Sequence, residues 1–127
     1  MILTKTLSKK DNIENSSGSI QIEKVDLVNF KRVGQIIEKF KPDTIIHLAG
    51  NTSHSKSFEE PLDDIESNTK TTLFMLEKIR ELGLSCKFVL GSTFIVIGRP
   101  EKLPVTENTP CNPTTIYGTN RLASEHY

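Results

Sequence analysis

The apolar residues of this chain follow two different spacings that alternate along the sequence. Residues 2–7 and 19–25 alternate apolar and polar positions, as β-strands with one covered face do. Residues 43–50 and 86–93 are instead short apolar runs that end in small residues, which is typical of strands buried in a parallel sheet. The pattern therefore predicts four strands.

Helical spacings lie between and after these strands. In residues 28–40 apolar side chains recur every three or four positions, and Pro42 follows where that helix should end. Residues 58–82 repeat the spacing, with Gly83 as a stop, and a last helix is expected over residues 114–127. Strands that alternate with helices of this length predict an α/β fold, with a parallel sheet covered on both faces.

Composition narrows the classes of function. The chain has 127 residues, of which 35% are apolar and 25% charged, as in one ordinary globular domain. Lys and Arg number 16 and so do Asp and Glu, so no field of one sign favours nucleic acid or an anionic membrane as the main partner. Cys86 and Cys111 belong to no metal-binding spacing. We therefore expect no metal site, no membrane span and a cytoplasmic protein with reduced thiols.

Small and polar residues follow the two buried strands, at the edge where parallel sheets bind ligands. Ala49 and Gly50 offer a backbone surface against which a flat ligand can lie, although a tight turn would explain them equally well. Ser92 and Thr93 place hydroxyl groups at the same edge, although helix capping would also account for them.

Tyr117 and Arg121 lie one helical turn apart, after a long Pro-rich loop at residues 98–113. A phenol, with an ordinary pKa of about 10, is a poor base near neutrality unless a nearby cation favours the phenolate. A cation four residues further along a helix can have that effect. The spacing of the pair is therefore compatible with a tyrosine that acts as a base.

Taken together, these motifs resemble the extended short-chain dehydrogenase/reductases, which are NAD-dependent sugar-nucleotide epimerases and dehydratases. The resemblance covers about residues 20–127 and rests on HLAG at 47–50, Pro61 with Asn68 seven residues on, GSTFIVIG at 91–98, and P-x-x-x-Y-G-x-x-R-x-x-x-E at 113–125. It implies a Rossmann-like doubly wound sheet, NAD as the cofactor with NADP not excluded, and a nucleotide-sugar substrate. It also implies a homodimer through the helices at 58–82 and 114–127.

The resemblance assigns catalytic roles to three residues. Thr93 matches the serine or threonine that hydrogen-bonds the reacting hydroxyl or carbonyl group, and Tyr117 matches the general base. Arg121 stands where the family has a lysine that binds the nicotinamide ribose and lowers the pKa of the tyrosine. An arginine can stabilise a phenolate without reproducing the lysine's other contacts, so this departure bears on the catalytic rate and not on the fold.

Tyr117 and Arg121 are also expected to contact the cofactor, together with six further positions. These are Asp26 and Leu27, where the family's aspartate contacts the adenine; Ala49 and Gly50, at the strand end that lines the dinucleotide; and Asn68 and Ser92, near the active site.

Phe94 and Ile95 follow Thr93 where family dehydratases and decarboxylases have carboxylates. Neither side chain can transfer a proton, which favours 4-epimerase or simple reductase and dehydrogenase chemistry. Whether the cofactor is NAD or NADP stays open, because Lys9 and Lys10 could meet a 2′-phosphate or be solvated.

The family's glycine-rich GxxGxxG loop has no counterpart among the seven glycines. Residues 2–7 resemble the family's second strand, and the absent first strand is central in this fold. We therefore expect residues 1–127 to be a partial Rossmann domain, without the first strand and the C-terminal substrate region, and inactive alone as an internal fragment or truncated product. The alternative is a degenerate, non-catalytic paralogue that binds a nucleotide or mediates dimerisation.

Overall fold

The computed structural model describes residues 1–6 and 19–127. Lys9 and Lys10 lie outside the described residues.

All four predicted strands are present, and they pair in parallel as expected. They are β1 (Ile2–Thr4), β2 (Ile22–Lys24), β3 (Thr44–His47) and β4 (Lys87–Leu90). Each is shorter than the range predicted for it, and a turn follows β2, where the Asn29 N–H donates to the Asp26 carbonyl at 2.9 Å. In the described part of the chain the strands form two separate pairs, β1 with β2 and β3 with β4. This agrees with the expectation of an incomplete doubly wound sheet.

Helix α2 (Phe30–Phe40) follows from its capping residues and its apolar stripe. The side chain of Asn29 accepts a hydrogen bond from the Arg32 N–H, and Lys41 takes a left-handed conformation that ends the helix before Pro42. Its stripe, Val33, Ile36 and Ile37, joins Val25 and Met75 in the core. Phe40, at the end of the helix, is 48% exposed.

The single helix predicted for residues 58–82 is divided into segments. They are α3 (His54–Glu59), α4 (Pro61–Asp64), a π-helical turn (Ile65–Lys70) and α5 (Thr71–Glu81). The break before α4 falls at Pro61, which has no N–H to continue the helix. Around the π-helical turn, threonine hydroxyls donate back to carbonyls, Thr71 to Ser67 at 2.8 Å and Thr72 to Asn68 at 2.9 Å. Apolar spacing does not indicate such bonds, so the sequence analysis did not predict the change from α-helix to π-helix.

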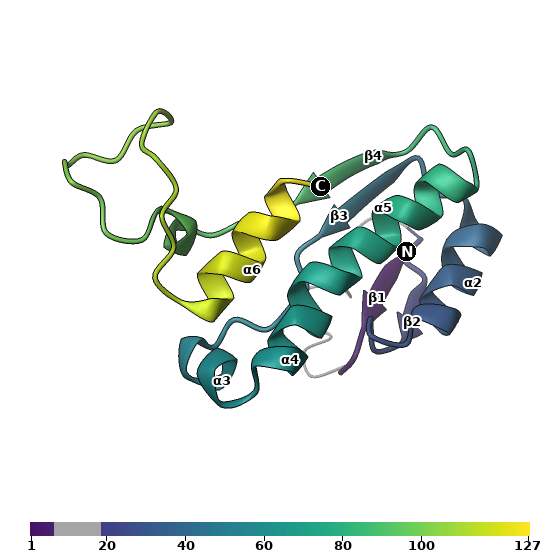
Figure 1. Ribbon diagram of the computed structural model, residues 1–127. Helices are drawn as coiled ribbons and strands as arrows, with labels where there is room; N and C mark the ends of the chain where they lie inside the picture. The colour runs from purple at the N-terminus through teal and green to yellow at the C-terminus, as the bar shows by residue number, and fades with distance from the viewer. Residues whose placement is uncertain (7–18) are drawn as a thin grey trace.

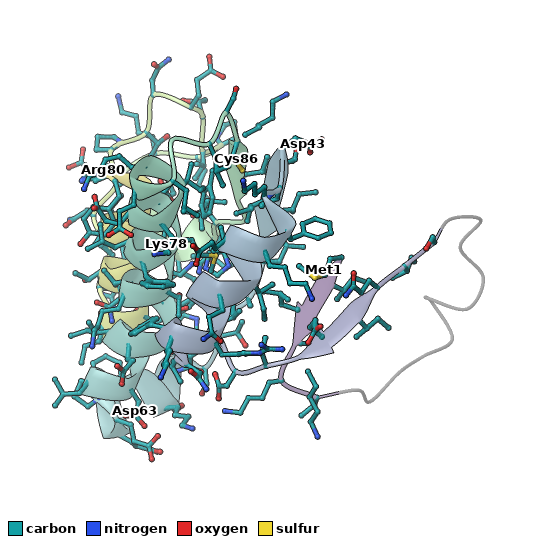
Figure 2. All side chains as sticks on the ribbon, turned by 90° about the vertical axis from the view of Figure 1, so that its right-hand side faces the viewer. Met1, Asp43, Asp63, Lys78, Arg80 and Cys86 are labelled. Carbon is teal, nitrogen blue, oxygen red and sulfur yellow. The ribbon has the colours of Figure 1, made fainter. Side chains whose placement is uncertain are left out.

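A short 3₁₀ helix (Phe94–Ile97) follows β4, and α6 (Ile116–Glu125) ends the described chain. Figure 1 shows α2, α5 and α6 on the same side of the strands, and the perpendicular view in Figure 2 agrees. The described helices thus cover one face of the strands, whereas the sequence pattern predicted helices on both faces. Ile46 and Leu48, on the other face, are 65% and 72% exposed. Among the residues described, no helix is long and apolar enough to cross a membrane.

Candidate functional site

Helix α6 brings Tyr117 and Arg121 to the carboxyl ends of β3 and β4. Together with the residues that follow these strands, they line a small pocket of about 150 Å³: Leu48, Gly50, Asn51, Thr52, Gly91, Ser92, Tyr117 and Arg121. This is the edge at which the sequence placed a ligand site.

Tyr117 is held by contacts with α3 and by the start of its own helix. Its N–H donates to the Ser57 hydroxyl at 3.3 Å, and its ring meets the His54 ring edge-on, with 5.2 Å between the centroids. The Thr115 side chain caps α6 by accepting from the Gly118 N–H at 2.9 Å. The phenol is therefore presented from a buried, fixed backbone.

Arg121 is a buried cation, 5% exposed. Its Nη2 donates to the Gly91 carbonyl, and its Nη1 lies 3.5 Å from Asn68 Oδ1. Its Nε is buried and, among the described residues, has no hydrogen-bond partner. The guanidinium is thus anchored through Nη1 and Nη2, and among the described residues neither nitrogen bonds to the Tyr117 phenol. Its Nε remains available as a donor.

Asp64 organises the polar core behind the pocket and was missed by the sequence analysis. It is fully buried, and its Oδ1 accepts from the side chains of Asn51 and Asn68 at 2.8 and 3.1 Å. Its Oδ2 accepts from the Asn120 side chain at 2.7 Å. Asp64 thereby ties the loop after β3 to α6 and fixes the Asn68 that faces Arg121. The four-residue spacing between Asp64 and Asn68 was the available signal, because it places the two side chains on one face of a helix.

His47 is a second buried polar group that the sequence analysis quoted only as part of HLAG. It is 3% exposed, and its Nε2 lies 3.5 Å from the Thr71 hydroxyl. Burial, and to a lesser extent the Arg121 charge, lower the pKa of His47 to about 4. Its ring is therefore neutral near pH 7, which avoids a second positive charge beside Arg121.

The two hydroxyls after β4 have different partners. Ser92 lines the pocket and donates to Glu125 of α6. Thr93 is not among the lining residues; its hydroxyl accepts from the Ile95 N–H at 3.4 Å and caps the 3₁₀ helix. Thr93 thus caps a helix here, which is the alternative that the sequence analysis gave for its hydroxyl.

Four of the other expected cofactor-binding residues line a larger cavity of about 560 Å³ across the strand ends: Asp26, Leu27, Ala49 and Gly50. Lys5 binds Asp26 at 2.7 Å, and this hydrogen bond is the main reason that the pKa of Asp26 is lowered.

Gly50 and Asn51 line both cavities, so the two are adjacent. A Cβ atom at Gly50 would overlap Asn68 Oδ1, which explains the need for glycine there. Asn68 lines neither cavity and lies buried behind them.

Known proteins are similar to this chain in sequence and in fold. A family model described as GDP-mannose 4,6 dehydratase matches residues 3–127. A UDP-glucose 4-epimerase of Mycolicibacterium smegmatis is 31% identical over 121 residues, which are 94% of this chain and 38% of the relative.

Two solved structures are also similar. The UDP-Glc/GlcNAc 4-epimerase of Campylobacter jejuni superposes with a TM-score of 0.87 at 29% identity, over 98% of this chain and 38% of that one. The UDP-glucose 4-epimerase of Bifidobacterium longum, in complex with NAD⁺ and UDP, gives 0.80 at 25% identity, over 89% of this chain and 34% of that one. This chain thus spans less than two fifths of the length of these relatives. It belongs to the extended short-chain dehydrogenase/reductases, the family of NAD-dependent sugar-nucleotide epimerases and dehydratases.

Proposed function

We propose that residues 1–127 form a partial NAD-binding Rossmann domain that supplies the tyrosine side of the active site of a nucleotide-sugar epimerase. The observation that carries this proposal is the placing of Tyr117 and Arg121, both buried, at a pocket that continues through Gly50 and Asn51 into a larger cavity. Activity requires the further segments that the longer relatives contain.

The residues present fit a dinucleotide cofactor. The unpartnered Nε of Arg121 suits a ribose hydroxyl, and Gly50 lets a flat group approach the backbone. Asp26 and Leu27 would hold the adenine end, with the Asp26 carboxylate released from Lys5, and Tyr117 and Arg121 the nicotinamide end. When bound, the cofactor supplies a reversible hydride acceptor.

The residues around the small pocket then divide the remaining work. Tyr117 takes the proton of the sugar hydroxyl as a general base. The positive charge of Arg121, held in place by Gly91 and Asn68, stabilises the phenolate. Thr93 hydrogen-bonds the reacting oxygen after its hydroxyl leaves the Ile95 N–H, a bond that is long at 3.4 Å and is readily exchanged.

The substrate we propose is a nucleotide sugar, and the reaction is epimerisation. Phe94 is 82% exposed beside Thr93, and neither it nor Ile95 can move a proton, so elimination of water lacks an acid and a base at this position. The similarity to proteins named UDP-glucose 4-epimerase supports the same reaction type.

The proposed role of Arg121 can be tested in a chimera in which this chain replaces the matching segment of the Campylobacter jejuni 4-epimerase. We expect Arg121→Lys to keep UDP-glucose epimerisation within about threefold of the chimera or to raise it, because an ammonium reaches the same ribose. Arg121→Met should lower kcat at least about tenfold, because the charge is lost. A folded Met variant with unchanged kcat would show that Arg121 acts only structurally.

We also propose that the complete protein forms a homodimer through α3 to α5 and α6. Apolar residues recur along one run of these helices and remain exposed in the single chain: Phe58, Leu62, Ile65 and Leu73. Light scattering should detect a dimer of the chimera that Leu62→Glu dissociates, whereas Glu81→Lys, at the exposed far end of α5, leaves it intact.

The free thiols of Cys86 and Cys111 suit the reducing cytoplasm, where we place the protein.

A further inference from the structure

Asp64 carries a buried charge that the steps proposed above do not use. Its side chain is fully buried and accepts from the side chains of Asn51, Asn68 and Asn120 at 2.8, 3.1 and 2.7 Å. All three partners donate, whereas a protonated carboxyl group would need an acceptor for its own hydrogen, so the group is an ionised carboxylate. The ion pairs of the described residues do not include it. A buried charge held only by neutral amides is costly unless an opposite charge lies near it.

Arg121 is the complementary case. It is 5% exposed, and its partners among the described residues, the Gly91 carbonyl and Asn68 Oδ1, are both uncharged. Arginine does not lose its proton in proteins, so this charge is permanent. Asp64 and Arg121 are therefore two buried, opposite charges, and both contact Asn68.

The Asn68 side chain joins the two charges in one orientation. Its Nδ2 donates to Asp64 Oδ1 at 3.1 Å, and its Oδ1 lies 3.5 Å from Arg121 Nη1. A reversed amide would turn its oxygen toward a carboxylate and its donors toward a guanidinium, and neither pairing forms a hydrogen bond. Asp64 therefore fixes the Asn68 amide, and the amide oxygen fixes the guanidinium.

This chain of contacts is shielded from water. Asn68 is fully buried, and a Cβ atom added to Gly50 would meet both Asn68 Oδ1 and Arg121 Nη1, so the Gly50 backbone covers their contact. Charges in such an interior are screened much less than exposed charges. An unopposed Arg121 would favour the Tyr117 phenolate strongly, and a strongly favoured phenolate is a weak base. The negative charge of Asp64 offsets part of this effect.

We propose that Asp64 is a positioning residue for the epimerase site: through Asn68 it holds Arg121 and balances its charge, and so limits how strongly Arg121 favours the Tyr117 phenolate. This inference rests on the proposed function, in which Tyr117 is the base and Arg121 its cation.

Other titratable groups lie on α6 and on the elements packed against it, and the 3₁₀ helix is the packed element that contributes none. They are His54, Lys56 and Glu59 of α3, Asp63 of α4, Glu66 and Lys70 of the π-helical turn, His47 beside Arg121, and Glu125 of α6. Only Asp63 is altered in the variants below, as the control.

Tyr117 can be titrated directly in this chain. The chain has two tyrosines and no tryptophan, and Tyr127 is exposed, so Tyr127→Phe leaves Tyr117 as the single phenol. The near-ultraviolet absorbance of the phenolate, followed against pH, then gives the midpoint of its ionisation. In this background Asp64→Asn should move the midpoint to lower pH by at least about half a unit, because the opposing charge is lost while the bonds from Asn51 and Asn68 are kept.

Asp63→Asn is the matched control, because it removes a charge one position away on the same helix. Asp63 is exposed, at the lower edge of the view in Figure 2, and solvent screens its charge. The midpoint should therefore move by less than about 0.2 unit in this variant.

Arg121→Met separates this inference from the proposed function on which it rests. It should move the midpoint to higher pH, and the double variant with Asp64→Asn should lie between the two single variants. If Arg121→Met raises the midpoint but Asp64→Asn leaves it in place or raises it, Asp64 is not the balancing charge, and this proposal alone is overturned. If Arg121→Met also leaves it in place, the proposed role of Arg121 fails as well.

The chimera with the Campylobacter jejuni 4-epimerase gives a second measurement if circular dichroism shows that the chain unfolds before its phenol ionises. The rising limb of kcat/KM against pH for UDP-glucose epimerisation should move to lower pH in Asp64→Asn and stay in place in Asp63→Asn. A folded, NAD-binding Asp64→Asn chimera whose rising limb does not move would overturn the proposal.

Discussion

Replacing Asp64 should destabilise the fold far more than replacing its neighbour Asp63, although both substitutions remove one negative charge. Asp64 is fully buried and accepts hydrogen bonds from three asparagine side chains, whereas Asp63 is exposed. Asp64→Asn keeps the shape of the side chain but turns one accepting oxygen into a donating amide.

The magnitude follows from the contacts. The least costly orientation of the new amide keeps the bonds from Asn51 and Asn68 and faces the donating amide of Asn120, leaving that buried donor unsatisfied at a cost of about 1–3 kcal/mol. Asp64→Ala removes all three acceptor contacts, and two of the donors, on Asn68 and Asn120, are buried. For this variant we expect a loss of about 4 kcal/mol, a large part of the stability of an ordinary domain.

Urea denaturation followed by circular dichroism measures these free energies of unfolding. Asp63→Asn is the control and should change the free energy of unfolding by less than about 0.5 kcal/mol. If Asp64→Asn and Asp63→Asn change it equally, Asp64 does not organise the polar core as described here.

Two further predictions concern pH and backbone conformation. The unfolded chain protonates His47 near pH 6.5 and the folded chain only near pH 4, so stability is full above pH 6.5 and falls as the pH is lowered, by about 2 kcal/mol between pH 6.5 and 5. Urea denaturation midpoints measured across this pH range should show the loss of stability. The control His126→Gln should lose as much stability as the parent chain, whereas His47→Gln should lose less. If stability falls equally steeply with pH in His47→Gln, His47 is not the group responsible. Gly83 and Gly98 both have positive φ, but only at Gly98 would a Cβ overlap the Asn112 carbonyl. Thermal unfolding should therefore show that Gly83→Ala costs about 1 kcal/mol and Gly98→Ala clearly more, and equal costs would argue against this packing.

The sequence predicted those parts of the fold that depend on local spacing. The stripe of Val33, Ile36 and Ile37 is an amphipathic helix with a proline beyond its end, and the apolar runs are parallel strands. The sequence analysis missed the division of the helix predicted at 58–82. Its π-helical turn lies beside bonds from the Thr71 and Thr72 hydroxyls to backbone carbonyls, and an apolar pattern does not indicate such bonds.

The candidate site was predicted in part for the same reason. Tyr117 and Arg121 share a helix, so their spacing in the sequence placed them together. Asp64 and Asn120 are 56 positions apart, and the bond between them depends on how α4 packs on α6. A polar contact of that sequence separation has no signal in a single sequence.

The most direct test of the central claim is the effect of Tyr117→Phe on the chimera with the Campylobacter jejuni 4-epimerase. The ring and its edge contact with His54 remain, so the fold and NAD binding should be nearly unchanged. We predict that kcat for UDP-glucose epimerisation falls at least about 100-fold, in line with the loss of a general base. A folded, NAD-binding Phe variant that keeps most of the chimera's activity would contradict the assignment of Tyr117 as the base.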